Sequence, residues 1–248
     1  MTAIGTIARN PVGTIEVSVL HGDSPQQIYR RIDGALFVAG LPGLPYTLRV
    51  RNLTSGRIEV INTVDGRHTL KDEPGDSERN RGLIFAAHST GAFTGWRLNN
   101  DETRQFVFGA PDRSVAAMAT GSASNTGVIG FAAYRERELP ATAFASYGNS
   151  PILRGGGASF AAAASFDSNM ASKPAGDAAP RGLGTGMGER QSDHVGTTTF
   201  TRAAGSPDIL VIGYDTEDAL RAMGVMGPPE PSAFPGAGTG YEKYAAQA

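Results

Sequence analysis

Residues 46–61 read YTLRVRNLTSGRIEVI, and this stretch decides the predicted fold class. Apolar and polar residues alternate over residues 46–51 and again over residues 57–61. Because successive side chains of a β-strand point to opposite faces, each half predicts a strand with one buried face. Residues 52–56 have the Asn, Ser and Gly content of a turn, so we expect the two strands to pair as a hairpin.

Strands of the same kind are expected on both sides of this stretch. Residues 14–20 alternate with β-branched residues on one face, and Asp65-Gly66 marks a tight turn. Residues 115–119 predict one turn of helix. Further short strands are predicted over residues 82–85, 93–98, 104–108 and 127–134. We therefore expect an all-β fold over residues 1–138, an antiparallel β-sandwich of the jelly-roll or immunoglobulin-like type.

The composition changes after this expected sandwich domain. Residues 139–181 consist mainly of Ala, Ser and Gly, which offer too little apolar bulk to offset the conformational entropy lost on ordering. We expect an extended arm or linker there, and an irregular tail over residues 227–248. Both segments carry widely spaced aromatic residues, which a plain linker does not need. Our hypothesis is that these side chains dock onto a partner: Phe144, Tyr147, Phe160, Phe166, Phe234, Tyr241 and Tyr244.

Between these two segments, residues 182–226 are expected to form a small C-terminal module of β-strands and a helix. Residues 197–201 and 208–214 predict the strands. A short helix should follow, with Asp215 or Thr216 as its cap, acidic residues in its first turn and Gly224 at its end.

The composition also limits the partners. The chain has no cysteine, which excludes disulfides, thiolate metal sites and cysteine nucleophiles. Its formal net charge is -2 with both signs interspersed, so we expect no nucleic-acid partner. It has no apolar run of about 18 residues and no secretory signal at its N-terminus, so we expect no membrane partner and synthesis in the cytoplasm.

No catalytic pattern emerges from the titratable residues. The chain has four histidines: His21, His68, His88 and His194. Their spacing fits no metal motif, and we interpret them as solvated loop or strand-end residues. Ser89 beside His88 suggests a triad with Asp65 or Asp101, but Ser89 lacks the GxSxG elbow. We therefore expect a non-enzymatic protein with no catalytic residue, no metal and no cofactor.

Three further patterns have structural interpretations. The glycine-rich run over residues 182–188 lacks the strand, lysine and helix of a phosphate loop, so we interpret it as a turn-rich entry to the C-terminal module. Trp96 is interpreted as a core anchor rather than a sugar-stacking platform. The 71–80 loop carries acidic residues that miss the calcium-loop spacing, and we interpret them as solvated: Asp72, Glu73, Asp76 and Glu78.

A series of short motifs runs through the chain: Tyr46-x-Leu-x-Val-x-Asn52, Arg57-x-Glu-Val, Val64-Asp-Gly66, Arg81-Gly-Leu, Gly95-Trp-Arg97, Phe106-x-Phe108, Asn125-x-Gly-Val-Ile-Gly-Phe131, and the stretches from Gly184 to Arg190 and from Tyr214 to Val225. In this order they resemble a family of uncharacterised bacterial and phage-associated β-sandwich proteins. The resemblance covers residues 14–134 and 182–225. It implies a β-sandwich without established enzyme chemistry, and some members resemble virion decoration, or minor capsid, proteins.

These expectations combine into a structural virion component. We expect a phage capsid decoration or minor head protein, which binds the major capsid protein or other assembly subunits and is a homo-oligomer in the assembly. It would be made in the host cytoplasm and lie at the virion surface. The alternative is a cytoplasmic soluble β-sandwich module that binds carbohydrate or protein through the loops at residues 71–80 and 99–102.

Overall fold

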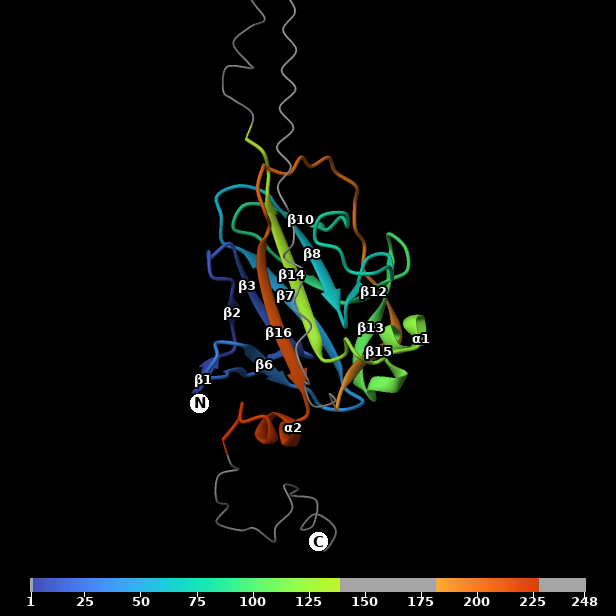
Figure 1. Cartoon of the computed structure of the whole chain (residues 1–248). Helices are drawn as coiled ribbons and strands as arrows, with labels where there is room; N and C mark the ends of the chain where they lie inside the picture. The colour runs from blue at the N-terminus through green and yellow to red at the C-terminus, as the bar shows by residue number, and fades with distance from the viewer. Residues whose placement is uncertain (1, 139–181, 228–248) are drawn as a thin grey trace, which may run out of the picture.

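The computed structural model describes residues 2–138 and 182–227, which form two β-sheets with two short α-helices (Figure 1). This confirms the expected all-β class. The first sheet runs in the order β1 (Thr2–Gly5), β5 (Ile28–Arg30), β6 (Leu36–Ala39), β16 (Asp208–Asp215), β14 (Val128–Arg135), β8 (Ile58–Val64) and β10 (Leu83–Phe85), with β9 (Arg67–His68) paired to β8.

The second sheet runs in the order β12 (Gly95–Arg97), β13 (Glu102–Gly109), β7 (Pro45–Asn52), β3 (Ile15–His21) and β2 (Ala8–Arg9). Three more strands join it: β11 (Thr90–Phe93) on β7, β15 (Gly184–Ser192) on β13 and β4 (Ser24–Pro25) on β3. The named strand pairs are antiparallel except β6 with β16, which is parallel.

One hydrophobic core joins the two sheets. The first sheet contributes buried Ile58, Phe131 and Ile212, and the second contributes Val17, Leu48 and Phe106. Trp96 is 1% exposed, its indole N–H donates to the carbonyl of Gly186 (3.2 Å), and its ring meets Phe106 edge-on at 5.3 Å. The interpretation of Trp96 as a core anchor is therefore confirmed.

The expected hairpin of residues 46–51 and 57–61 is wrong, although both strands exist. β7 belongs to the second sheet and β8 to the first, so residues 53–57 cross between the sheets. The buried Asn52 side chain holds this corner, because its amide donates to the carbonyls of Gly56 and Ala86 (both 2.8 Å). Its Oδ1 accepts from the backbone N–H of Thr54 (2.8 Å). Alternation predicts a strand but does not specify its partner.

The glycine-rich run is a strand rather than the expected turn. β15 pairs with β13 over almost its whole length, and its glycines permit close packing. A Cβ at Gly184 would lie 2.7 Å from Cβ of Ser114, and one at Gly188 would lie 2.5 Å from Cγ2 of Val107. Residues 182–226 thus supply one strand to each sheet, because β16 lies between β6 and β14.

Of the remaining predicted elements, the structure confirms some and contradicts one. Residues 208–214 form β16, and α2 (Glu217–Ala222) follows with Thr216 as its N-cap, as expected. The expected helical turn is α1 (Val115–Thr120), which lies beside β13 and β15 (Figure 1). The strand expected over residues 197–201 is wrong, because this stretch is extended but joins neither sheet as a strand among the described residues.

A buried carboxylate lies where the two sheets meet. Asp65 occupies the predicted tight turn with a φ of 53°, and its side chain turns inward to 1% exposure. Its Oδ1 accepts from the backbone N–H of Gly127 (2.8 Å) and the hydroxyl of Tyr214 (2.7 Å), and its Oδ2 accepts from the backbone N–H of Thr185 (2.7 Å). Asp65 therefore bonds to β15 of one sheet and β16 of the other.

Two hydroxyls extend this network. Oγ1 of Thr185 lies 2.7 Å from the Tyr214 hydroxyl and 2.8 Å from the Tyr46 hydroxyl. The Tyr214 hydroxyl donates its hydrogen bond to Asp65, so the hydroxyls of the network all donate in the same direction. Tyr46 donates to Thr185, Thr185 donates to Tyr214, and Tyr214 donates to the carboxylate. Burial raises the pKa of Asp65 to about 6, even though the bond from Tyr214 and the backbone N–H groups oppose the rise.

Replacing Tyr214 with Phe should lower the free energy of unfolding by about 1–3 kcal/mol, because a buried acceptor loses its donor. It should also raise the pKa of Asp65 further above about 6, because the bond from Tyr214 lowers that pKa. A raised folded-state pKa gives stability that is present below the unfolded value of about 3.9 and lost as pH rises through the folded value. Urea unfolding between pH 4 and 8 should therefore show a larger loss of stability in the variant.

The matched control is Tyr29→Phe, which changes a partly buried tyrosine outside this network. If Tyr214→Phe and Tyr29→Phe show the same pH dependence as the unaltered protein, Tyr214 does not tune Asp65.

Candidate binding groove

A groove of about 610 Å³ lies on one open side of the fold. Its floor is β10 of the first sheet and β11 of the second, which residues 86–89 connect. Sheet edges therefore border it on two sides. The lining residues are Leu70, Lys71, Arg81, Gly82, Leu83, Ile84, Phe85, Ser89, Thr90, Gly91, Ala92, Arg97, Asn100, Val195, Gly196, Thr197 and Thr198. A volume of this size falls in the range typical of ligand-binding clefts, roughly 300–1,000 Å³.

The strap, residues 193–201, crosses this side between the two sheets. Asp193 anchors its first end: its backbone N–H donates to the carbonyl of Asp101 (2.8 Å), and its carboxylate accepts from Thr94 (2.5 Å) and Arg97 (3.0 Å). The Arg97 side chain is only 8% exposed and also donates to the carbonyl of Asp193 (2.9 Å). This largely buried ion pair fixes the strap to the end of β12.

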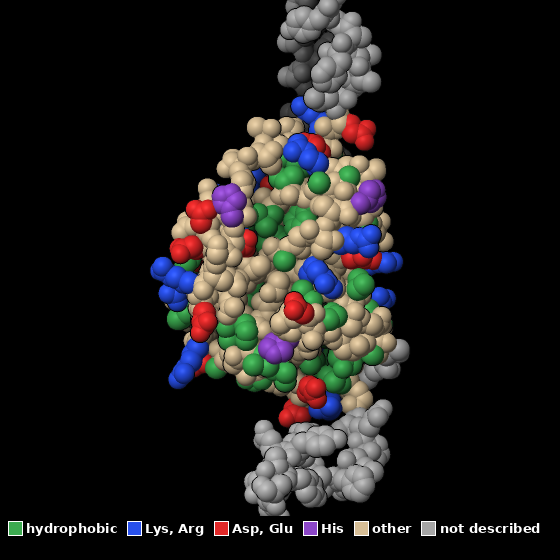
Figure 2. Space-filling model, turned by 180° about the vertical axis from the view of Figure 1, so that it is seen from behind, with side chains coloured by type: hydrophobic (Ala, Val, Ile, Leu, Met, Phe, Trp, Pro, Cys, Tyr) green, Lys and Arg blue, Asp and Glu red, His purple; other side chains and the backbone are tan. Residues whose placement is uncertain are grey.

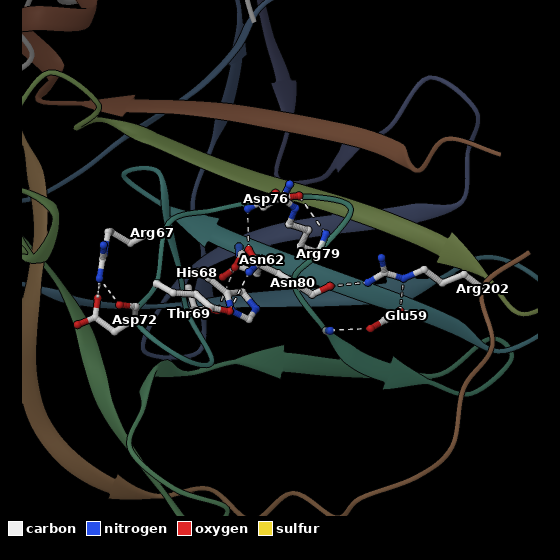
Figure 3. Close-up of polar contacts among 12 residues, drawn as sticks. Glu59, Asn62, Arg67, His68, Thr69, Asp72, Asp76, Arg79, Asn80 and Arg202 are labelled. Carbon is white, nitrogen blue, oxygen red and sulfur yellow. Dashed lines mark hydrogen bonds and ion pairs between the residues drawn. The ribbon is translucent and has the colours of Figure 1, made fainter. Parts of the chain in front are cut away.

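The second end of the strap is fixed to the first sheet. The Thr201 carbonyl accepts from the backbone N–H of Arg137 (2.8 Å), and Phe200 packs on Ile61, Ala132 and Tyr134. Next to the strap, Arg202 donates to Oε2 of Glu59 (2.7 Å), and its guanidinium lies 4.1 Å from the centre of the Tyr134 ring. Figure 3 shows Arg202 reaching along β8 toward Glu59 and Asn80, whose carbonyl it binds.

The loop at residues 66–82 forms the third wall, and its own polar side chains fold it. Arg67 donates to the carboxylate of Asp72 (2.9 Å), and Asn80 donates to Oε1 of Glu73 (2.8 Å). Asp76 accepts from the backbone N–H groups of Glu78 and Arg79 (both 2.9 Å), and these bonds lower its pKa. Figure 3 shows the contacts of Arg67 with Asp72 and of Asp76 with Arg79 beside β8. The carboxylates of Asp72, Glu73 and Asp76 therefore hold backbone and side chains of this loop in place, whereas Glu78 is exposed.

His68 contradicts its interpretation as a solvated residue. Its imidazole is 0% exposed, and its Nδ1 lies 3.5 Å from Oε1 of Glu73. Burial lowers its pKa, because the imidazolium form loses its hydration. His88 and His194 are exposed, as expected, and Nδ1 of His194 lies 2.6 Å from Oδ1 of Asp101.

The ionised side chains that line the groove are all cationic. Lys71 and Arg81 are exposed at its rim, Arg97 lies in its wall, and no Asp or Glu of the described residues lines it. Nε of Arg97 is buried without a hydrogen-bond acceptor among the described residues. The face of the molecule seen in Figure 2 carries acidic and basic side chains side by side, in keeping with the net charge of -2.

The residues that sequence reasoning selected fare differently. The loops at residues 71–80 and 99–102, chosen for the alternative binding module, come together here, since Lys71 and Asn100 both line the groove. The proposed triad of Ser89 and His88 does not form through Asp65, which binds Tyr214 and Thr185, or through Asp101, which contacts His194. The expected docking aromatics lie outside the described residues: Phe144, Tyr147, Phe160, Phe166, Phe234, Tyr241 and Tyr244.

Sequence reasoning missed Arg97, Asp193, Glu59 and Arg202 as the residues that build the groove. No local signal marks them, because Arg97 lies 96 positions from Asp193 and Arg202 lies 143 positions from Glu59. Within residues 2–138 and 182–227, no three His, Asp or Glu side chains group as a metal site would need.

Comparisons with protein-family models, with curated proteins and with solved structures found no match to this chain. The resemblance to phage-associated β-sandwich proteins therefore stays an expectation. No helix of the described residues is long and apolar enough to span a bilayer.

Replacing Arg202 with Met should destabilise the fold by about 1–3 kcal/mol. The carboxylate of Glu59, which is 2% exposed, loses its nearest cation and keeps only the backbone N–H of Gly82 (2.8 Å) and the more distant Arg81 (3.8 Å). Protease should then cut the 66–82 loop and the strap faster, because Arg202 no longer holds them to β8. Urea unfolding and limited proteolysis measure both effects.

Two variants control this experiment. Arg190→Met changes an exposed arginine of β15 and should leave both measurements unchanged. Adding Glu59→Gln to Arg202→Met should restore part of the lost stability, because residue 59 then no longer carries a buried charge that has lost its nearest cation. Equal stability of Arg202→Met and the unaltered protein would show that this ion pair does not hold the groove.

Proposed function

We propose that this chain is a non-enzymatic binding protein of a larger assembly, such as a phage capsid decoration or minor head protein, and that the groove holds its partner. The observation that carries the proposal is the groove itself, a cleft of about 610 Å³ between the edges of two sheets. In this proposal the two sheets are a β-sandwich of the jelly-roll or immunoglobulin-like type, and residues 139–181 are an arm. The shared core of the two sheets supports the first part.

The way the groove is built favours a role in binding. Its walls are held by ion pairs and side-chain hydrogen bonds at both ends of the strap and within the 66–82 loop. A site whose supporting side chains are locked by packing and hydrogen bonds loses little entropy when a partner binds. Such a rigid groove suits the recognition of an assembly subunit that presents the same surface to every copy of this chain.

The alternative is a soluble module that binds carbohydrate or protein through the same groove. The meeting of the loops at residues 71–80 and 99–102 supports it. Protein is the better ligand of the two, because Trp96 is buried and offers no face for stacking on a sugar ring. Both readings place the partner in the same groove and differ in whether the partner belongs to a particle.

Particles purified from cells that make this protein should contain it at a fixed copy number, measured by quantitative mass spectrometry. Deleting its gene should remove a density from the particle surface in electron micrographs. Particles that contain none of the chain would contradict the assembly role and leave the soluble module as the function.

A further inference from the structure

Two strand edges face the groove, and no strand of the described residues pairs with them on that side. β10 is the last strand of the first sheet, and β11 has only β7 as a partner among the described strands. Unpaired edges present backbone N–H and C=O groups that pair readily with another extended chain. The strap does not provide that pairing, since no backbone hydrogen bond of the described residues joins residues 196–199 to either strand.

The positive charge around these edges favours an extended chain with acidic side chains. Lys71 and Arg81 are exposed at the rim, and within residues 2–138 and 182–227 no carboxylate lines the groove. Arg81 lies 3.8 Å from Glu59 and keeps 66% of its side chain exposed, so most of its guanidinium stays available. Ammonium and guanidinium groups at a rim steer and orient carboxylates.

We propose that the groove takes an extended acidic peptide segment of a partner protein, which adds as a β-strand to the open edge of β10 or β11. The acidic side chains of the segment meet Lys71 and Arg81. Side chains on its other face meet Leu83 and Ile84, which are half-buried in the floor. In this mode backbone hydrogen bonds supply affinity and alternate side chains supply specificity. The inference rests on the proposed binding function and names the chemistry of its partner.

Selection of random twelve-residue peptides, displayed on beads, against the full chain tests this proposal. We expect enriched peptides in which Asp or Glu alternates with apolar β-branched residues. Binding of a selected peptide should slow hydrogen exchange at the amides of β10 and β11. Enrichment of neutral or basic peptides, or protection at other strands alone, would overturn the proposal.

A charge variant and a matched control sharpen the test. The double variant Lys71→Glu with Arg81→Gln should bind the selected peptides at least tenfold more weakly. Its urea unfolding should change little, because Arg202, at 2.7 Å, remains the nearer partner of Glu59. The control, Arg30→Glu with Arg113→Gln, alters exposed arginines outside the groove and should bind normally. Equal binding by both double variants would overturn the acidic-peptide proposal. Binding of polygalacturonate, an acidic polysaccharide, in place of acidic peptides would overturn it as well.

The same variant separates this inference from the proposed function. If the chain is present on particles and the Lys71→Glu, Arg81→Gln variant occupies them fully, the assembly role stands and the acidic-segment proposal fails. If selected acidic peptides bind in the groove but the chain is absent from particles, the segment proposal stands and the assembly role fails.

Discussion

The carboxylate of Asp65 is the constraint on which the joining of the two sheets depends. It lies at the end of β8, accepts from a backbone N–H of β15 and from Tyr214 of β16, and through Thr185 reaches Tyr46 of β7. A buried anion costs several kcal/mol unless donors surround it, so each of these strands must reach its position before the charge is compensated. The network therefore acts against misregistered sheets. It also explains why a tight turn carries Asp at a buried position, where the turn alone requires only a residue that tolerates a φ of 53°.

Local patterns predicted the strands well and their partners poorly. Alternation and turn residues are properties of a few neighbouring positions, and they located β3, β7, β8, β10, β13, β14 and β16. Pairing depends on residues far apart, so the hairpin of β7 and β8 was wrong. The Gly-rich β15 escaped detection for a related reason. Its glycines record the closeness of Ser114 and Val107, which only the folded chain reveals.

The same holds for the groove and for Asp65: local features were predicted, and contacts between distant residues were not. Composition identified the loops at residues 71–80 and 99–102 as exposed, and both border it. The Asp65-Gly66 turn was predicted, but the partners of Asp65 lie 62, 120 and 149 positions away, so its buried role was not. His68 was taken for a solvated residue because an isolated histidine carries no sign of burial. The residues 197–201 have strand composition, yet they cross from one sheet to the other, where no neighbouring strand can pair with them.

The position of β16 has a consequence for how the protein is made. This strand is fixed between β6 and β14, yet it is contributed by residues 208–215, near the end of the chain. Because β16 lies between β6 and β14, the first sheet cannot be completed until residue 215 has been synthesised. Contacts across such long sequence separations close slowly, and open strand edges are exposed to other chains while they do. The facing edges of β6 and β14 therefore stay open to other chains until β16 pairs with both.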